Sequence, residues 1–191
     1  MAPQETRLTQ RASYRHGDVR AEAVDRALAS IEEVGEQGIA MRAIAQALGV
    51  AHRTLHHHFA DREGLLREVS ARGFALLADV LDAEQTERGF VIAYLRFGLA
   101  RPQLYTLMMR QRADAGQASP ALGSARDRVI ARALAVLAPD EADPDAGRRR
   151  VMRTWMTLHG GLALNASSTL MARDPEQFEA EMLRIVEPGE G

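Results

Sequence analysis

The chain has 191 residues, 46% of them hydrophobic and 26% charged, which is typical of a globular protein and excludes a disordered one. It contains no cysteine, so disulfides and thiolate metal sites are excluded. The formal net charge of −2 argues against a protein that coats nucleic acid without regard to sequence, because such binding grows with the number of neutralised phosphates.

The N-terminal residues 1–17 are polar, with Arg7, Arg11 and Arg15 against a single acid, Glu5. They lack the apolar core of a signal peptide. No later run of about 18 apolar residues is long enough to cross a membrane. We therefore expect a cytoplasmic protein without a membrane partner.

The first predicted helix runs from Asp18 to about Glu36, and glycines at 35 and 38 close it. Its apolar residues recur at helical spacing: Val24, Ala27, Leu28 and Ile31. This helix is expected to brace the segment that follows.

Residues 39–59, IAMRAIAQALGVAHRTLHHHF, predict two short helices joined by a turn at Gly49. The second of them has only Leu55 and Phe59, four residues apart, as apolar anchors. Its other side chains must point away from the core and carry polar groups: His52, Arg53, Thr54, His56, His57 and His58. A helix, a short turn with glycine and a helix with a polar free face are typical of a helix-turn-helix that binds DNA.

The remaining elements are also predicted to be helical. Asp61, followed by Glu63 in a first turn, predicts a long helix through Leu81 that connects two bodies. A capping residue followed by proline predicts three later helices, at Ser119-Pro120, Asp143-Pro144 and Asp174-Pro175. Residues 111–119 lack periodicity and predict a mobile loop.

No alternating strand pattern is present, so we predict an all-α fold. Residues 1–17 form either a disordered tail or a flexible basic arm that reaches the DNA backbone or minor groove. Residues 18–62 form a three-helix helix-turn-helix DNA-binding domain. The long fourth helix joins it to a helical ligand-binding and dimerisation domain, residues 63–191.

Aromatic and methionine side chains gather in this C-terminal part. Each alone is better explained as core, but together they mix apolar bulk with a few polar groups, as the lining of a small-molecule pocket does. The predicted ligand-binding residues are Phe90, Tyr94, Phe97, Tyr105, Met108, Met109, Trp155 and His159.

The helix predicted from about 144 to Leu170 is apolar on two sides, so it must be buried on both. One stripe is Val151, Trp155, Leu158, Leu162 and Ala166; the other is Met152, Met156, His159, Ala163 and Leu170. A monomer of this size has difficulty covering that surface, which favours a two-fold homodimer over a monomeric bundle built around this helix. The predicted dimerisation residues are Val151, Leu158, Leu162, Ala166, Phe178, Met182 and Ile185.

Metal and enzyme chemistry find little support in the sequence. Consecutive histidines on a helix point about 100° apart, so His56, His57 and His58 cannot converge on one ion. No nucleophile elbow, glycine-rich phosphate loop or close carboxylate pair is present. We therefore expect no cofactor, no metal and no enzymatic activity.

The chain resembles the TetR family of one-component transcriptional regulators. Over residues 14–66 the resemblance rests on YRHGDVR, IAMRAIAQALGV and LHHHFADREGLL. In the C-terminal half, YLRFGLARPQLYTLMM and WMTLHGGLAL resemble family members with a Trp-His-Gly-type ligand-binding domain.

The resemblance implies DNA contacts for individual positions. Arg42 occupies a position of the second helix that often contacts DNA, and His52, Arg53 and Thr54 begin the recognition helix. His57 is expected to read bases with them. Arg62 occupies the position of a basic residue that contacts phosphate.

His58 matches the family's usual histidine before the aromatic residue, and it is expected to contact phosphate together with His56. The chain departs from the family pattern at three positions. His56 replaces a tyrosine, Ala51 a serine, and Ala40 a serine or threonine.

These observations predict a ligand-responsive regulator that binds double-stranded DNA. The resemblance implies a repressor that binds a pseudo-palindromic operator as a homodimer and is released by a small apolar or amphipathic effector. The alternative is a helical homodimer that binds a small ligand or a protein partner without binding DNA.

Overall fold

The computed structural model describes residues 18–111, 119–169 and 174–186. These residues form helices and no strand, which confirms the all-α prediction. The helices are α1 (Val19–Gly38), α2 (Met41–Ala47), α3 (His52–His58), α4 (Arg62–Asp82), α5 (Glu87–Ala100), α6 (Pro102–Arg110), α7 (Pro120–Leu137), α8 (Pro144–Ala166) and α9 (Pro175–Val186). No helix in this part of the chain combines the length and apolar character that a membrane crossing requires.

The predicted helix starts are confirmed by their caps. Asp18 accepts a hydrogen bond from the amide of Ala21 at 2.9 Å, and Asp61 accepts one from Gly64 at 2.7 Å. The helices α7, α8 and α9 each begin at the predicted proline. By contrast, Ala40 and Ala51 at the starts of α2 and α3 provide no side-chain cap, so these two short helices depend on packing.

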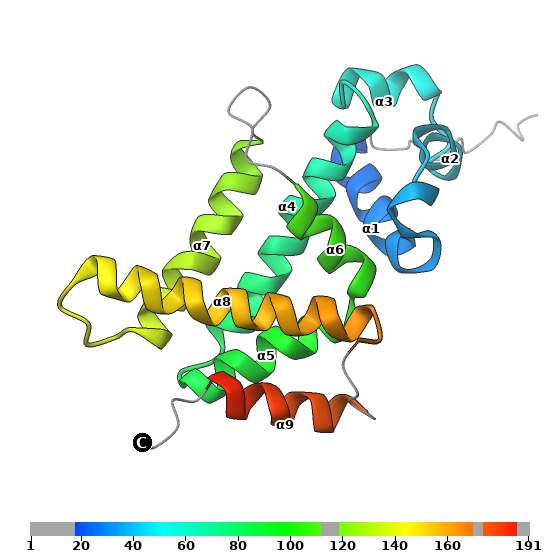
Figure 1. The fold of residues 1–191 in the computed structure, drawn as a ribbon. Helices are drawn as coiled ribbons and strands as arrows, with labels where there is room; N and C mark the ends of the chain where they lie inside the picture. The colour runs from blue at the N-terminus through cyan, green and yellow to red at the C-terminus, as the bar shows by residue number, and fades with distance from the viewer. Residues whose placement is uncertain (1–17, 112–118, 170–173, 187–191) are drawn as a thin grey trace, which may run out of the picture.

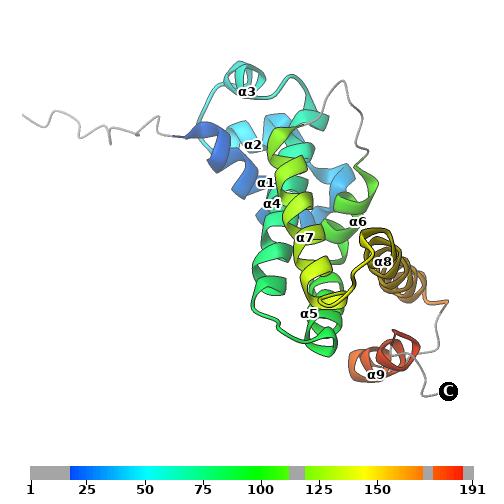
Figure 2. The same ribbon diagram turned by 90° about the vertical axis from the view of Figure 1, so that its left-hand side faces the viewer.

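The helix α4 connects two bodies, as predicted. It begins beside α1, α2 and α3 at one end of the molecule and runs into the other body, where it packs along α7 (Figures 1 and 2). The helices α5, α8 and α9 pack against one another at the far end from α3. The core is continuous from α1 through α4 to α9.

The helix α6 is held at both ends by α1. The Glu32 carboxylate accepts the backbone amides of Gln103 at 3.2 Å and Leu104 at 2.9 Å. These amides lie in the first turn of α6, where Arg101 provides no side-chain cap. At the last turn, the Arg110 guanidinium pairs with Glu36. A carboxylate of α1 therefore caps a helix of the other body.

Three sequence expectations differ from the structure or lie wholly or partly outside the described residues. The helix predicted to run to Leu170 ends at Ala166, and Leu170 lies outside the described residues. The predicted basic arm, residues 1–17, also lies outside them, as do residues 112–118 of the predicted loop. Within α1, Gly35 has φ +61°, so the chain turns there before Ile39 reaches the core.

Candidate functional site

The helices α2 and α3 are fixed by a small set of apolar anchors. Met41, Ile44 and Ala45 are the buried residues of α2. Leu55 is the buried residue of α3, and Phe59 follows it into the core. Gly49, with φ +68°, provides the left-handed turn between the two helices. The predicted helix-turn-helix geometry is therefore formed by the anchors that the sequence indicated.

The polar residues of α3 lie on its outer side. His52, Arg53, His56 and His57 are exposed, as is Arg42 on α2. The rings of His52 and His56 meet edge to face with 4.7 Å between their centroids. No described residue pairs with Arg42 or Arg53 in a salt bridge. Both guanidinium groups are thus open to a partner that accepts hydrogen bonds.

Thr54 and His58 are half-buried rather than exposed. Both belong to α3, where the chain packs Leu55 and Phe59 inward. The His58 ring lies against Phe59, with 6.5 Å between the ring centroids. These two positions expose less side chain to DNA than the other four of α3.

Arg62, for which a phosphate contact was expected, is engaged within the chain. Its Nε donates to the backbone oxygen of Ile39 at 2.8 Å, and a second nitrogen donates to the backbone oxygen of Glu36. Its third nitrogen pairs with Glu63 at 3.0 Å. The reason is that α4 begins beside the turn between α1 and α2. Arg62 fastens that turn to α4 in the free protein.

No group of three histidine, aspartate or glutamate side chains is placed to hold a metal ion among the residues described. His16, the remaining histidine near the N-terminus, lies outside them.

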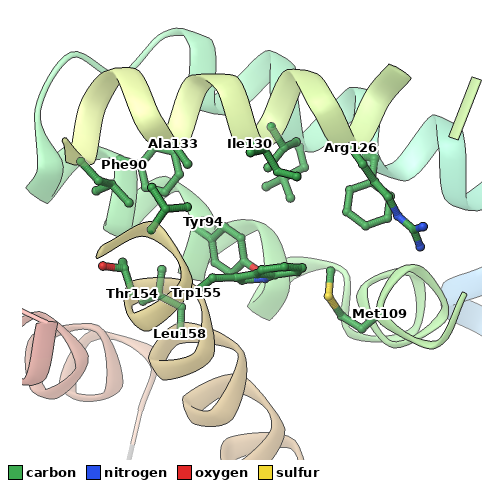
Figure 3. Close-up of a pocket in the computed structure, with 14 residues that line it drawn as sticks. Phe90, Tyr94, Met109, Arg126, Ile130, Ala133, Thr154, Trp155 and Leu158 are labelled. Carbon is green, nitrogen blue, oxygen red and sulfur yellow. The ribbon is translucent and has the colours of Figure 1, made fainter. Parts of the chain in front are cut away.

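A second candidate site is an apolar pocket of about 80 Å³ in the other body, between α4, α5, α6, α7 and α8 (Figure 3). Four of the predicted ligand-binding residues line it: Phe90, Tyr94, Met109 and Trp155. The remaining lining is Phe74, Leu77, Arg126, Val129, Ile130, Ala133, Leu137, Val151, Thr154 and Leu158.

A chain of hydrogen bonds runs along one wall of this pocket. The Trp155 indole donates to the Tyr94 hydroxyl at 2.8 Å, and the Tyr94 and Tyr105 hydroxyls are 2.9 Å apart. The Tyr105 hydroxyl lies 3.1 Å from Nδ1 of His159. Tyr105 and His159 thus belong to the site as neighbours of the lining residues.

Burial raises the pKa of both tyrosines. It raises the pKa of Tyr105 to about 12, although the hydrogen bond from Tyr94 works in the opposite direction. For Tyr94 burial raises the pKa well above its ordinary value, and the neighbouring Tyr105 adds to the effect. Both hydroxyls are therefore neutral near pH 7 and already satisfied by protein partners.

The structure separates Phe97 and Met108 from the predicted pocket set. Both are buried, but they do not line the pocket. Their side chains fill the core, and Met108 packs against Gly73, where an added Cβ would lie 2.7 Å from its sulfur. The lining residues that sequence reasoning missed lie chiefly on α7, where Val129, Ala133 and Leu137 recur every four residues. That apolar spacing was the available signal.

Four predicted dimerisation residues are buried within the single chain. Leu158, Leu162, Phe178 and Met182 are between 1% and 5% exposed, so they offer no surface to a partner. The helix α9 supplies the cover that a second subunit was expected to supply, since it packs on α5 and α8. Of the other three, Val151 lines the pocket, whereas Ala166 and Ile185 are exposed.

The apolar stripe of α8 that faces solvent is the second one. Met152 is 50% exposed and Met156 61%. Gly160 and Ala163 continue the same helix face, and a Cβ added at Gly160 would meet no atom within 4 Å.

Solved structures share this fold. A protein of unknown function from Rhodococcus sp. RHA1 is 26% identical, with a TM-score of 0.74 over 92% of this chain and 97% of that chain. The regulator FadR from Bacillus subtilis, solved with stearoyl-CoA, is 15% identical, with a TM-score of 0.64 over 90% of this chain and 99% of that chain. A TetR variant from Acinetobacter baumannii AYE, solved with minocycline, is 16% identical, with a TM-score of 0.62 over 86% and 90% of the two chains. No curated protein matches the sequence.

Two family descriptions match the sequence itself. Residues 23–69 match the bacterial regulatory proteins of the tetR family. Residues 87–186 match the tetracyclin repressor-like C-terminal domain. The first segment contains the helix-turn-helix, and the second contains α5 to α9 and most of the pocket lining. The chain therefore belongs to the TetR family: it is a DNA-binding transcriptional regulator with a ligand-binding C-terminal domain, and not an enzyme.

Proposed function

We propose that this regulator is a homodimeric repressor, which binds a pseudo-palindromic operator and is released by a small apolar or amphipathic effector. The observation that carries the proposal is the outer face of α2 and α3, where Arg42, His52, Arg53 and His57 are exposed above a buried anchor, Leu55. Two such faces related by a two-fold axis would enter major grooves about 34–36 Å apart, or a multiple of this spacing.

The proposed DNA contacts fall into base contacts and phosphate contacts. Arg42, His52, Arg53, Thr54 and His57 are proposed to read bases, since arginine forks match guanine and imidazoles donate or accept. His56 and His58 are proposed to contact phosphate and set the register. Arg62 acts on DNA through the turn that it fastens, because its nitrogens are bonded to Ile39, Glu36 and Glu63.

The experiment is binding of the purified protein to the DNA flanking its own gene, at two salt concentrations and with excess non-specific competitor. We expect specific binding that weakens steeply with salt. The substitution Arg53→Gln should weaken it about tenfold or more, because a bidentate base contact is worth roughly 1–3 kcal/mol. Arg184→Gln on α9 is the matched control, since this arginine pairs only with Glu181 among the described residues. Equal loss in both variants, or no specific complex with the folded protein, would contradict the proposal.

For the dimer, we propose the solvent-facing stripe of α8, Met152, Met156, Gly160 and Ala163, together with Ala166 and Ile185, which the sequence also indicates. Exposed methionines beside an open glycine suit close packing of two helices. Met156→Glu should convert the dimer to monomers in sedimentation experiments. Val80→Glu, at a side chain 42% exposed on α4, should not. A dimer that survives Met156→Glu would exclude this face.

The effector proposal is supported by the pocket, which is apolar and adjoins α6. Solved proteins of this fold hold minocycline in one case and stearoyl-CoA in another. The sequence WMTLHGG, with Trp155 on the wall and His159 in its hydrogen-bond chain, supports assignment to the Trp-His-Gly type of C-terminal domain. An effector needs only to prefer the conformer that no longer fits the operator, and a preference of about 100-fold corresponds to roughly 2.7 kcal/mol.

A further inference from the structure

The pocket wall contains three residues with strongly polar side-chain groups besides Trp155: Tyr94, Thr154 and Arg126. The Tyr94 hydroxyl is already bonded to Trp155 and Tyr105. Thr154 is buried at the end of the pocket near Phe90 (Figure 3). Arg126 lies at the opposite end, beside Met109 (Figure 3). The pocket is thus apolar along its length, with a cation at one end.

The described residues around Arg126 provide a backbone acceptor and an aromatic ring, but no carboxylate. One of its nitrogens donates to the backbone oxygen of Gln111 at 2.5 Å. Its guanidinium carbon lies 5.1 Å from the centroid of the Phe74 ring. No carboxylate among the described residues forms a salt bridge with it, whereas Arg128, two residues further along α7, pairs with Asp79 and Asp82. Within the part of the chain that the structure describes, Arg126 therefore has donors without a partner and no carboxylate to balance its charge.

Burial lowers the pKa of Arg126, the direction expected when a cation loses water without gaining an acid. A guanidinium stays charged at neutral pH all the same. A bound anion would replace the lost hydration and pair with the planar fork through two parallel hydrogen bonds. A neutral ligand of the same shape would give the guanidinium no counter-charge.

We propose that the effector is a small carboxylic acid with an apolar body, whose carboxylate pairs with Arg126 while the body lies between Phe90, Ile130 and Trp155. This inference rests on the proposed function and names the chemical class of its effector. The pocket volume of about 80 Å³ limits the enclosed part of the body. An engineered cavity of about 150 Å³ holds benzene, so this smaller space encloses only part of a single ring or a short branched chain, and the rest of the body must lie in the open part of the pocket.

Trp155 makes the proposal measurable without DNA. It is the single tryptophan of the chain and lies on the pocket wall, so its fluorescence reports occupancy directly. The probes are phenylacetate and benzoate, each compared with its neutral amide, phenylacetamide or benzamide. We expect saturable fluorescence changes with both acids, and affinities for the amides about tenfold lower or weaker still, as expected for a charge-assisted pair worth roughly 1.5–3 kcal/mol.

Variants of two arginines on the same helix separate charge in the pocket from charge on the surface. Arg126→Gln should lower the affinity for the acids to that for the amides, and Arg126→Lys should restore part of the difference. Arg128→Gln removes a cation that pairs with Asp79 and Asp82 outside the pocket, and it should leave the preference for acids intact. Thermal unfolding of each variant without ligand checks that the fold is kept.

The outcomes for this inference and for the proposed function are distinct. If neither acid binds, if acids and amides bind equally, or if Arg126→Gln keeps the preference for acids, the inference is overturned. Each of these results leaves operator binding by the wild-type protein untouched. If the acids bind through Arg126 but no specific DNA complex forms, the ligand class stands and the repressor proposal fails.

Discussion

The two functional regions treat their polar groups in opposite ways. On α2 and α3, Arg42 and Arg53 face solvent without a salt-bridge partner among the described residues. At the pocket, the Tyr94 hydroxyl bonds to that of Tyr105, which lies behind the lining residues. The donors of the first region are exposed and can bind an acceptor on another molecule. The two tyrosine hydroxyl groups of the second region are hydrogen-bonded within the protein, and the remaining lining is mostly apolar. Arg126 is the exception within the second region.

The helices that form the two regions also differ in length, capping and burial. The helix α3 has seven residues, no side-chain cap and a single buried residue. The helices that wall the pocket are longer, and α4, α5, α7 and α8 each have a side-chain cap. The DNA-facing pair is therefore the part that opens at lower free energy, and the pocket belongs to the more stable core. Four measurements test this contrast.

The largest effect is expected from the anchor of α3. Leu55 is fully buried, and Leu55→Ala should destabilise the DNA-binding end by about 2–5 kcal/mol, because it leaves a cavity that the short helix cannot close. Urea unfolding followed by circular dichroism, together with operator binding, measures it. Leu164→Ala, at a side chain 44% exposed on α8, is the control and should cost less than about 0.5 kcal/mol. Similar midpoints for the two variants would refute the assigned role of Leu55.

The next effect concerns the tyrosine pair at high pH. In the folded state Tyr105 keeps its proton to about pH 12, whereas the unfolded chain releases it near 10. The stability that this shift represents is complete below pH 10 and is lost as pH rises toward 12, by up to roughly 2.7 kcal/mol. The chain contains no lysine or cysteine, so the tyrosines dominate in this range, and Tyr94, whose pKa burial also raises, adds to the loss. Urea midpoints measured between pH 9.5 and 11.5 should fall more steeply for the wild type than for Tyr105→Phe; parallel curves would contradict the buried pair.

The third prediction concerns the clamp on α6, which is formed by Glu32 and Glu36 of α1. It is tested at Glu32. Glu32→Ala removes the acceptor of the Gln103 and Leu104 amides and should cost about 1–2 kcal/mol, comparable with the loss of a helix cap. Amide hydrogen exchange in α6 should accelerate in the same variant. The exposed neighbour Glu33 provides the matched substitution, Glu33→Ala, for which no such change is expected. Unchanged exchange in α6 would show that the cap is dispensable.

The smallest effect is a gain at the start of α3. Ala51→Ser supplies the missing cap and should stabilise the helix by about 0.5–1 kcal/mol. Ala43→Ser, in the interior of α2, serves as the control because serine there satisfies no free amide. Thermal unfolding compares the two. A stabilisation in both variants, or in neither, would mean that capping does not limit the stability of this helix pair.

Local signals in the sequence predicted most of the fold. Asp61 and the three cap-and-proline pairs mark helix starts through contacts within one turn, and these starts are confirmed. The inner face of α3 follows from Leu55 and Phe59, whose spacing leaves only one face for the core. Such features depend on residues close together in the chain.

The features that the sequence could not predict depend on which helices meet. The spacing of Leu158 and Leu162 indicates burial but does not distinguish α9 of the same chain from a second subunit as the cover. The phosphate contact of Arg62 was implied by the family resemblance, and local spacing could not indicate its partners Glu36 and Ile39, because they are more than 20 residues away. Arg126 was not predicted because its place in the pocket wall, beside Phe74, depends on how α4 and α7 pack.

The clamp on α6 also determines where this chain can be divided. The residues of the C-terminal match begin at 87, yet α6 depends on Glu32 and Glu36, and α6 carries Met109 of the pocket wall and Tyr105 beside it. A fragment that starts at 87 would lose both acidic partners and the α4 side of the pocket together. A chimaera with the DNA-binding end of a relative would keep this pocket intact only with acidic side chains at positions 32 and 36. In this protein the ligand-binding unit therefore extends, in sequence, into the first helix of the DNA-binding end.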